Sequence, residues 1–213
     1  MTVSCIIPAW NEAATIGALV DIAAHHPLIS EVIVVDDGST DSTANIARTA
    51  GATVIRNNRN IGKAQSMDRG VAAARNDMIL FLDADLKGLT ADHLTNLINP
   101  IVANAADMTI AIRDRGGLIN KLNAQLGPWI AGERCLPKSL WGSVPAQFKK
   151  GFQIELALNH YARSQGLPVQ PVFLPGLSIR RKEQKMGLAR GLLARITMIG
   201  ELIQVSLRLL IRK

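Results

Sequence analysis

The sequence predicts an α/β fold with a mostly parallel central sheet flanked by helices. Short apolar runs rich in β-branched residues alternate with segments of helical periodicity, three times within the first sixty residues. Such alternation is typical of a parallel sheet, because each strand needs a crossover connection to reach the next. Acidic residues also follow two of the apolar runs directly. Because ligands bind outside the carboxyl ends of such strands, the acids predict a ligand site there.

The expected elements follow this alternation in chain order. Pro8 is expected to end the first strand, since proline cannot donate to a sheet ladder. Gly62 lies in a polar turn before the third helix, and Cys135 is expected in a loop. The expected strands cover residues 3–8, 31–35, 54–56 and 78–82, and the expected helices cover residues 15–23, 43–50 and 65–74.

The last of these strands leads into Asp83-Ala84-Asp85. Ionised carboxylates at the end of a buried strand repel each other, so a cation is expected beside them. Mg²⁺ or Mn²⁺ carrying a phosphorylated ligand suits such oxygen-rich sites. The alternative for an isolated Asp-x-Asp is that Asp83 caps a turn and Asp85 is solvated. Lys63, at the start of a helix, either meets a phosphate or is solvated.

Composition and charge exclude several classes of function. The net charge of +7 arises entirely from residues 180–213, which hold nine basic and two acidic residues. No aromatic or polar base-reading residues accompany these basic groups, so a nucleic-acid partner is not expected. A phosphate loop and a dinucleotide-binding glycine fingerprint are both missing, which argues against an ATPase and a nicotinamide enzyme. With two cysteines and no recognisable secretory signal, a reducing, cytoplasmic compartment is expected.

Four ordered motifs in the first 85 residues resemble the family 2 glycosyltransferases of GT-A fold. They are Pro8-Ala9-Trp10-Asn11-Glu12, the segment 34–41 around Asp36-Asp37-Gly38, Asn60-Ile61-Gly62-Lys63, and Asp83-Ala84-Asp85. Three later segments are similar to those of the polyprenyl-phosphate (dolichol-phosphate) mannose and glucose synthases. These are Ala131-Gly132-Glu133-Arg134, Gly151-Phe152-Gln153-Ile154-Glu155, and the basic motif 181–187.

The resemblance implies a role for each matching residue. A nucleotide sugar would be held by Pro8, Ala9, Asn11, Glu12, Asp36, Asp37, Lys63, Asp83 and Ala84. The metal would be held by Asp85, with Asp83 directed toward the ribose or the metal. Arg134, Arg181 and Lys185 would bind phosphate. The reaction implied is direct in-line transfer of a hexose with inversion.

The nature of the acceptor decides which further residues the chemistry needs. A lipid phosphate is already anionic and needs no general base, only fixed cations. Arg113 or Arg115, with Arg134, Arg181 and Lys185, would supply them. A sugar hydroxyl would need a carboxylate base, for which Glu133 and Glu155 are candidates alongside Asp85. Glu155 is otherwise a helix-face acid paired with a nearby cation.

The chain is expected to consist of two segments: a GT-A domain over residues 1–187 and a basic, amphipathic helical tail over residues 188–213. Charged and polar residues interrupt the tail before the roughly twenty apolar residues of a spanning helix. It suits a helix lying on an anionic membrane surface. The alternative is a helix packed on the domain or on a second subunit, which leaves oligomerisation open.

These observations together predict an enzyme that is peripherally associated with the cytoplasmic membrane. Its expected substrates are a nucleotide sugar of the GDP-mannose or UDP-glucose type and a polyprenyl phosphate. One alternative is transfer to a small-molecule or saccharide hydroxyl. An alternative of another class is a non-catalytic nucleotide-sugar-binding protein.

Overall fold

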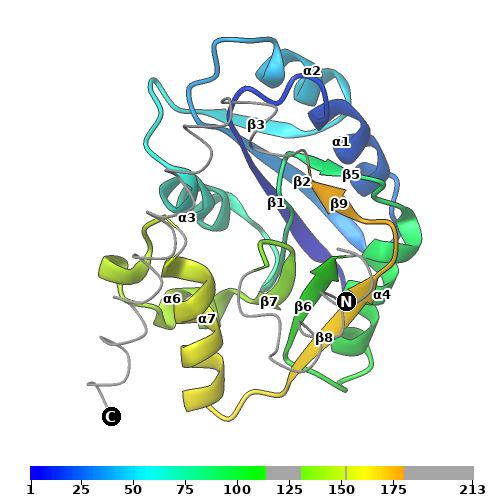
Figure 1. Cartoon of the computed structure of the whole chain (residues 1–213), viewed down its shortest axis with the longest axis vertical. Coiled ribbons are helices and arrows are strands. Elements are labelled where there is room, and N and C mark those ends of the chain that lie inside the picture. The colour runs from blue at the N-terminus through cyan, green and yellow to red at the C-terminus, as the bar shows by residue number, and fades with distance from the viewer. Residues whose placement is uncertain (114–130, 152, 180–213) are drawn as a thin grey trace.

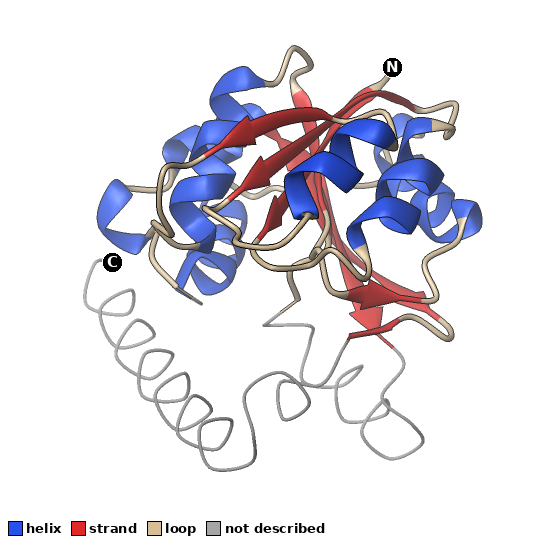
Figure 2. Cartoon of the chain, turned by 90° about the horizontal axis from the view of Figure 1, so that it is seen from above, coloured by secondary structure: helices blue, strands red, loops and turns tan. Residues whose placement is uncertain are grey.

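The computed structural model describes residues 1–113, 131–151 and 153–179, which form a central sheet with helices on both faces (Figures 1 and 2). The first half alternates strands and helices as expected: β1 (Val3–Ala9), α1 (Ile16–Ala24), β2 (Ile29–Asp36), α2 (Thr43–Thr49), β3 (Thr53–Arg56), α3 (Lys63–Ala73) and β4 (Met78–Phe81). The second half comprises β5 (Leu86–Lys87), α4 (Ala91–Val102), β6 (Met108–Arg113), β7 (Arg134–Pro137), α6 (Lys138–Ser143), the short helix η1 (Ala146–Phe148), α7 (Gln153–Ser164), β8 (Val169–Leu174) and β9 (Ser178–Ile179).

The central sheet has the strand order β3-β2-β1-β4-β7-β6-β8. The pairs β3–β2, β2–β1, β1–β4 and β6–β8 are parallel, and β7 is antiparallel to both β4 and β6. β7 is therefore the one reversed strand of this sheet. The order changes direction between β1 and β4, and their carboxyl ends form the crevice where ligands bind in such sheets.

Each face of the sheet has its own apolar core. Alternate residues of a strand point to opposite faces, and in β1 Cys5 and Ile7 pack on one side while Ile6 packs on the other. The first core includes residues of α1, α2 and α4, and the second includes residues of α3, α6 and α7. The expectation of a mostly parallel sheet covered by helices is confirmed.

Pro8 does not end β1, which runs one residue further to Ala9. The N–H of Leu82 donates to the carbonyl oxygen of Ile6 at 3.1 Å, so the polar groups of Ile6 face β4. Because residues two apart in a strand face the same neighbour, the ring nitrogen of Pro8 also points to that side. β4 pairs with β1 only as far as Phe81. The missing donor therefore costs no ladder bond.

Cys135 lies in β7, not in a loop, and its side chain is fully buried opposite Leu80. β7 is only four residues long, begins with arginine and ends with proline. The segment is too short to show the alternating pattern of a strand. It forms a strand because it pairs with both β4 and β6. None of the helices within the described ranges is long and apolar enough to cross a membrane.

Candidate active site

The loops after β1 and β2 are joined by hydrogen bonds at the carboxyl edge of the sheet. The backbone N–H of Asn11 donates to Ser39 Oγ at 2.9 Å, and Asn11 Oδ1 accepts from the N–H of Thr40 at 2.9 Å. Asn11 has φ 56°, a left-handed conformation that asparagine tolerates better than most residues. The N–H of Glu12 donates to Thr43 Oγ1 at 2.8 Å, at the start of α2. The two loops therefore form one rigid surface.

Asp37 organises the neighbouring loop between β3 and α3. Its Oδ1 accepts from Asn57 Nδ2 at 2.7 Å and from the N–H of Ile61 at 2.8 Å, and its Oδ2 accepts from the N–H of Gly62 at 2.8 Å. Gly38 has φ +73°, and a Cβ there would overlap the backbone at Arg59. This glycine therefore allows the loop to close over Asp37.

Asp36 is fully buried, and its carboxylate lies between the loop after β2 and the end of β3. Its Oδ1 accepts from the N–H of Ser39 at 3.0 Å, and its Oδ2 lies 3.2 Å from Arg56 Nε. Asp36 and Asp37 thus both hold loops at the carboxyl edge of the sheet, where the nucleotide is predicted to bind.

Lys63 and Asp83 form the centre of a charged cluster. Lys63 Nζ lies 2.6 Å from Asp83 Oδ1 and 3.3 Å from Glu155 Oε1. The cluster therefore joins the start of α3, the end of β4 and the first turn of α7. Burial disfavours the charged carboxylate, but the charges of Lys63 and Arg113, together with the hydrogen bond from Lys63, outweigh burial and hold the pKa of Asp83 below its usual value. Two carboxylates and one ammonium group from distant parts of the chain meet here. All three belong to predicted site residues, and Glu155 is paired with a cation, as its alternative interpretation expected.

Glu133 and Arg113 form a second, more deeply buried pair. Arg113 Nε lies 3.5 Å from Glu133 Oε2, and the Glu133 side chain is fully buried. Burial, reinforced by the nearby charge of Asp83, raises the pKa of Glu133 to about 7. Neither carboxylate oxygen of Glu133 has a hydrogen-bond partner within the described part of the chain. This carboxyl group is thus poised to exchange a proton near neutral pH.

Arg134 points inward from β7 and is only 1% exposed. Its Nε and Nη2 donate to the carbonyl oxygen of Ala131 at 3.1 and 2.6 Å. Its Nη1 donates to the carbonyl oxygen of Glu155 at 3.3 Å and to Asn159 Oδ1 at 3.2 Å. In this arrangement the guanidinium fastens α7 to the loop before β7. Its phosphate-binding role stays a prediction.

Asp83, Ala84 and Asp85 lie in the turn after β4, where Ala84 is tied to the first loop. The hydroxyl of Thr15 donates to the carbonyl oxygen of Ala84 at 2.7 Å. No cluster of three or more His, Cys, Asp or Glu residues suited to a metal ion occurs among the described residues. Two carboxylates still fit Mg²⁺ or Mn²⁺, because these ions commonly take their remaining ligands from phosphates and water. Gly132 makes room for Asp83, since a Cβ at Gly132 would overlap the Asp83 carboxylate.

Trp10 is a further candidate that the sequence reasoning did not name as a site residue. It lies directly after β1, and 51% of it is exposed. Large exposed aromatic side chains beside a crevice often bind ligands. The sequence does not predict that its side chain is exposed. Its position inside the first motif was the one indication that it could belong to the site. Pro8 and Ala9 lie at the end of β1 itself.

Several predicted residues lie outside the described ranges. These are Arg115, Arg181, Lys185 and the tail over residues 188–213. The predicted acceptor set is therefore represented here by Arg113 and Arg134.

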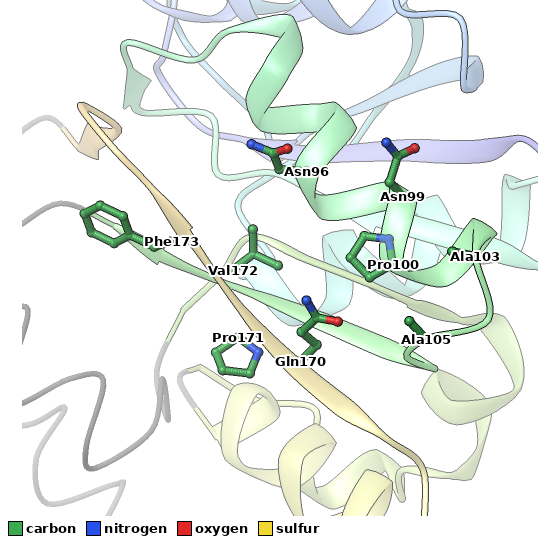
Figure 3. Close-up of a pocket in the computed structure, with 9 residues that line it drawn as sticks. All are labelled: Asn96, Asn99, Pro100, Ala103, Ala105, Gln170, Pro171, Val172 and Phe173. Atoms are coloured by element: carbon green, nitrogen blue, oxygen red, sulfur yellow. The ribbon is translucent and has the colours of Figure 1, made fainter.

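A cavity of about 540 Å³ lies elsewhere, between the second half of α4 and β8 (Figure 3). Its polar lining includes the amides of Asn96, Asn99 and Gln170. None of the predicted site residues lines it, and it lacks ionisable groups. The carboxyl edge of the sheet, with its charged cluster, remains the candidate active site.

Comparison with known proteins matches the family model described as glycosyl transferase family 2 over residues 4–163. This span includes both joined loops, the charged cluster and β7. The chain belongs to glycosyl transferase family 2. The GT-A fold expected from the sequence is confirmed by similar solved structures.

Among those solved structures is glucosyl-3-phosphoglycerate synthase from Mycobacterium tuberculosis in complex with phosphoglyceric acid. It is 28% identical with a TM-score of 0.71, over 84% of this family 2 chain and 72% of that one. The same enzyme in complex with Mn²⁺, uridine diphosphate and glucosyl-3-phosphoglycerate is 27% identical, with the same TM-score and coverage.

A curated relative is 4,4'-diaponeurosporenoate glycosyltransferase of Staphylococcus aureus (strain bovine RF122 / ET3-1). It is 39% identical over 103 residues, which are 46% of this chain. The match spans only 28% of that relative's length.

Proposed function

We propose that this protein is a metal-dependent hexosyltransferase that uses a nucleotide sugar as donor. The observation that carries the proposal is the placement of Asp83 and Asp85 at the crevice between β1 and β4, beside the joined loops after β1 and β2. Membership of glycosyl transferase family 2 supports the same reaction. Structures of a relative with Mn²⁺ or Mg²⁺ and uridine diphosphate support a divalent metal.

The nucleoside would be held by the joined loops. Asn11, Glu12, Asp36 and Asp37 fix their shape, and the exposed Trp10 offers a face on which a base can stack. Because these loops are already hydrogen-bonded to each other, binding would cost little ordering of the backbone.

The diphosphate would lie over Asp83 and Asp85, with Lys63 beside them. A bound divalent cation would neutralise the charge that develops on the leaving diphosphate. The protein's own contribution is to hold two carboxylates at the end of β4 and one ammonium group at the start of α3.

We propose a polyprenyl phosphate at the cytoplasmic face of a membrane as the acceptor. Its phosphate needs cations and no general base. Arg113, Arg115, Arg134, Arg181 and Lys185 would supply positive charge, and the basic tail would hold the protein at an anionic surface.

A second candidate acceptor is a small molecule that carries both an acid group and a hydroxyl. The similar structure with phosphoglyceric acid and its glucosylated product favours it. This reaction needs a general base, and the pKa of about 7 suits Glu133 for that role.

The test is a donor screen with labelled GDP-mannose, UDP-glucose and other nucleotide sugars, each with Mn²⁺ or Mg²⁺ and either a membrane lipid extract or phosphoglycerate. Label that enters the organic phase and is released by mild acid would establish a lipid-linked phosphosugar. A new aqueous product would identify the small-molecule acceptor instead. Binding of a nucleotide sugar without any product would contradict both enzymatic readings.

Asp85→Asn should lower kcat/KM at least about a hundredfold, since it removes a carboxylate proposed to hold the metal. Asp92→Asn is the matched control, because Asp92 is exposed in the first turn of α4. Equal activity of the two variants would count against the proposed metal site.

A further inference from the structure

Lys63 contacts two carboxylates that belong to different parts of the fold. Its Nζ lies 2.6 Å from Asp83 Oδ1 and 3.3 Å from Glu155 Oε1. Asp83 follows β4 in the N-terminal half, whereas Glu155 lies in the first turn of α7. A single ammonium group therefore links the predicted metal-binding turn to the C-terminal helix.

The Asp83 contact competes with any divalent cation at the same carboxylate. An ammonium group 2.6 Å from Oδ1 already neutralises Asp83. A cation bound at that carboxylate would be repelled by the ammonium charge if Lys63 stayed in place. A divalent cation bound at Asp83 would therefore displace Lys63 Nζ from that carboxylate.

Glu155 provides the place to which Lys63 can move. Its side chain is only 5% exposed, and its Oε2 has no hydrogen-bond partner in the described ranges. A buried carboxylate oxygen without a partner is costly, and a closer ammonium group would satisfy it. Lys63 already lies within ion-pair distance, so the exchange needs only a small movement of one flexible side chain.

Resting on the proposed function, we propose that Lys63 exchanges partners when the donor and metal bind, leaving Asp83 for Glu155 and the donor diphosphate. Glu155 is then a positioning residue that acts through Lys63. Glu155 then has no general-base role, because its carboxylate is engaged by the Lys63 ammonium group. With a phosphate acceptor no such base is needed.

The first test measures Mn²⁺ affinity by electron paramagnetic resonance in the presence of saturating UDP or GDP, whichever the unmodified protein binds. Glu155→Gln keeps the shape of the side chain but removes its charge. We expect Mn²⁺ affinity to fall about tenfold, because Lys63 then stays on Asp83. Glu31→Gln is the matched control, since Glu31 is a mostly buried acid paired with Arg75 outside the site.

A double-mutant cycle separates positioning from a direct effect. In a Lys63→Met background, Glu155→Gln should change Mn²⁺ affinity by less than about twofold, because the residue through which Glu155 acts is gone. An equal loss in both backgrounds would mean that Glu155 acts on the metal directly or through its field, and would overturn the proposal. No loss in either background would overturn it as well.

A crystal structure of the unmodified protein with Mn²⁺ and the nucleoside diphosphate tests the proposal without any variant, so a folding defect cannot affect the answer. Lys63 Nζ is expected beyond ion-pair distance of Asp83 and in contact with Glu155. A metal bound at Asp83 with Lys63 still on that carboxylate would refute the exchange. If the unmodified protein binds neither nucleotide with Mn²⁺, the proposed function fails first, and the inference fails with it.

Discussion

Neighbouring acids in the candidate active site have different environments. Asp83 lies beside Lys63, which keeps its pKa low, whereas burial and the Asp83 charge raise the pKa of Glu133 despite Arg113. One group is therefore suited to remain charged and the other to change its charge near pH 7. Pairs of titratable groups with separated pKa values are typical of active sites.

The raised pKa of Glu133 predicts a pH dependence of stability. When the pKa of an acid is higher in the folded than in the unfolded protein, the protonated acid stabilises the fold. This contribution is complete at a pH below the unfolded-state pKa and is lost as the pH rises through the folded-state pKa. As the pH rises from about 4.5 to 7, the unmodified protein should therefore lose stability relative to the Glu133→Gln variant. Urea denaturation of both proteins at several pH values measures the difference.

Glu31→Gln is the control, because its effect on stability should change with pH in the opposite direction. Burial would raise the pKa of Glu31, but hydrogen bonds from Ser4 and Arg75 hold it below its usual value. The contribution of Glu31 should therefore be lost as the pH falls. A Glu133 difference that stayed constant across the window would contradict its raised pKa.

Gly132 is required where the turn after β4 meets the loop before β7. Gly132→Ala would place a Cβ in the space of the Asp83 carboxylate and push it away from Lys63. We expect a loss of Mn²⁺ and donor affinity of roughly tenfold or more, together with lower stability. Gly142→Ala is the control: that Cβ meets nothing within 4 Å, and alanine favours the helix. Isothermal titration and thermal unfolding would distinguish the two variants.

At the scale of elements, α3 is held in place by a polar contact to α6 and the segment after it. Trp141 Nε1 donates to Asp68 Oδ1 at 2.6 Å, and Lys149 Nζ donates to the same oxygen at 3.0 Å. The Trp141 ring also packs on Phe81 of β4, with ring centroids 5.0 Å apart. Since Lys63 begins α3, these contacts also stabilise the position of the charged cluster.

Trp141→Phe should remove the hydrogen bond to Asp68 while keeping an aromatic ring against Phe81. We expect the free energy of unfolding to fall by at least about 1 kcal/mol, because Trp141 is buried and the smaller ring leaves space in the core, while Asp68 keeps Lys149 and partial access to water. Chemical denaturation measures this change. Trp10→Phe, at an exposed position, should alter the stability by less than about 0.5 kcal/mol. A larger loss at Trp10 than at Trp141 would contradict this account.

The sequence predicted the elements that have strong periodicity and missed those that depend on pairing. The strands at 31–35 and 78–82 were confirmed to within a few residues, because their β-branched and apolar runs are long enough to define them. Cys135 was placed wrongly, since β7 becomes a strand only between β4 and β6. The meeting of Lys63, Asp83 and Glu155 could not be predicted in detail, because it depends on how distant elements pack.

At the scale of the whole molecule, β8 is an outer strand of the sheet within the described part of the chain, and it contains a proline, Pro171. The N–H of Ala111 donates to Glu133, so the polar groups of Ile110 face β8. Pro171 lies opposite Ile110, and in a parallel pair this places its nitrogen on the outer side. Pro171 therefore removes a donor from the side of β8 that no other described strand pairs with, two residues before the exposed Phe173 (Figure 3).

Pro171→Val should make this edge competent to pair with another chain. We expect more dimer or aggregate at high concentration, which light scattering would detect, with little change in monomer activity. Pro168→Val is the matched control, because the Pro168 carbonyl faces β6 and not the outer edge. Equal association by both variants would contradict an edge-specific effect.

The reversed strand β7 also has a consequence for the growing chain. Its partner β4 is complete at Phe81, but β7 begins only at Arg134. A ribosome that adds ~5–20 residues per second needs roughly 3–10 s to make the intervening segment. During that interval one side of β4 is an uncovered edge next to a nearly finished parallel half-sheet. We therefore expect several seconds of synthesis in which this strand edge is open to pairing with other chains.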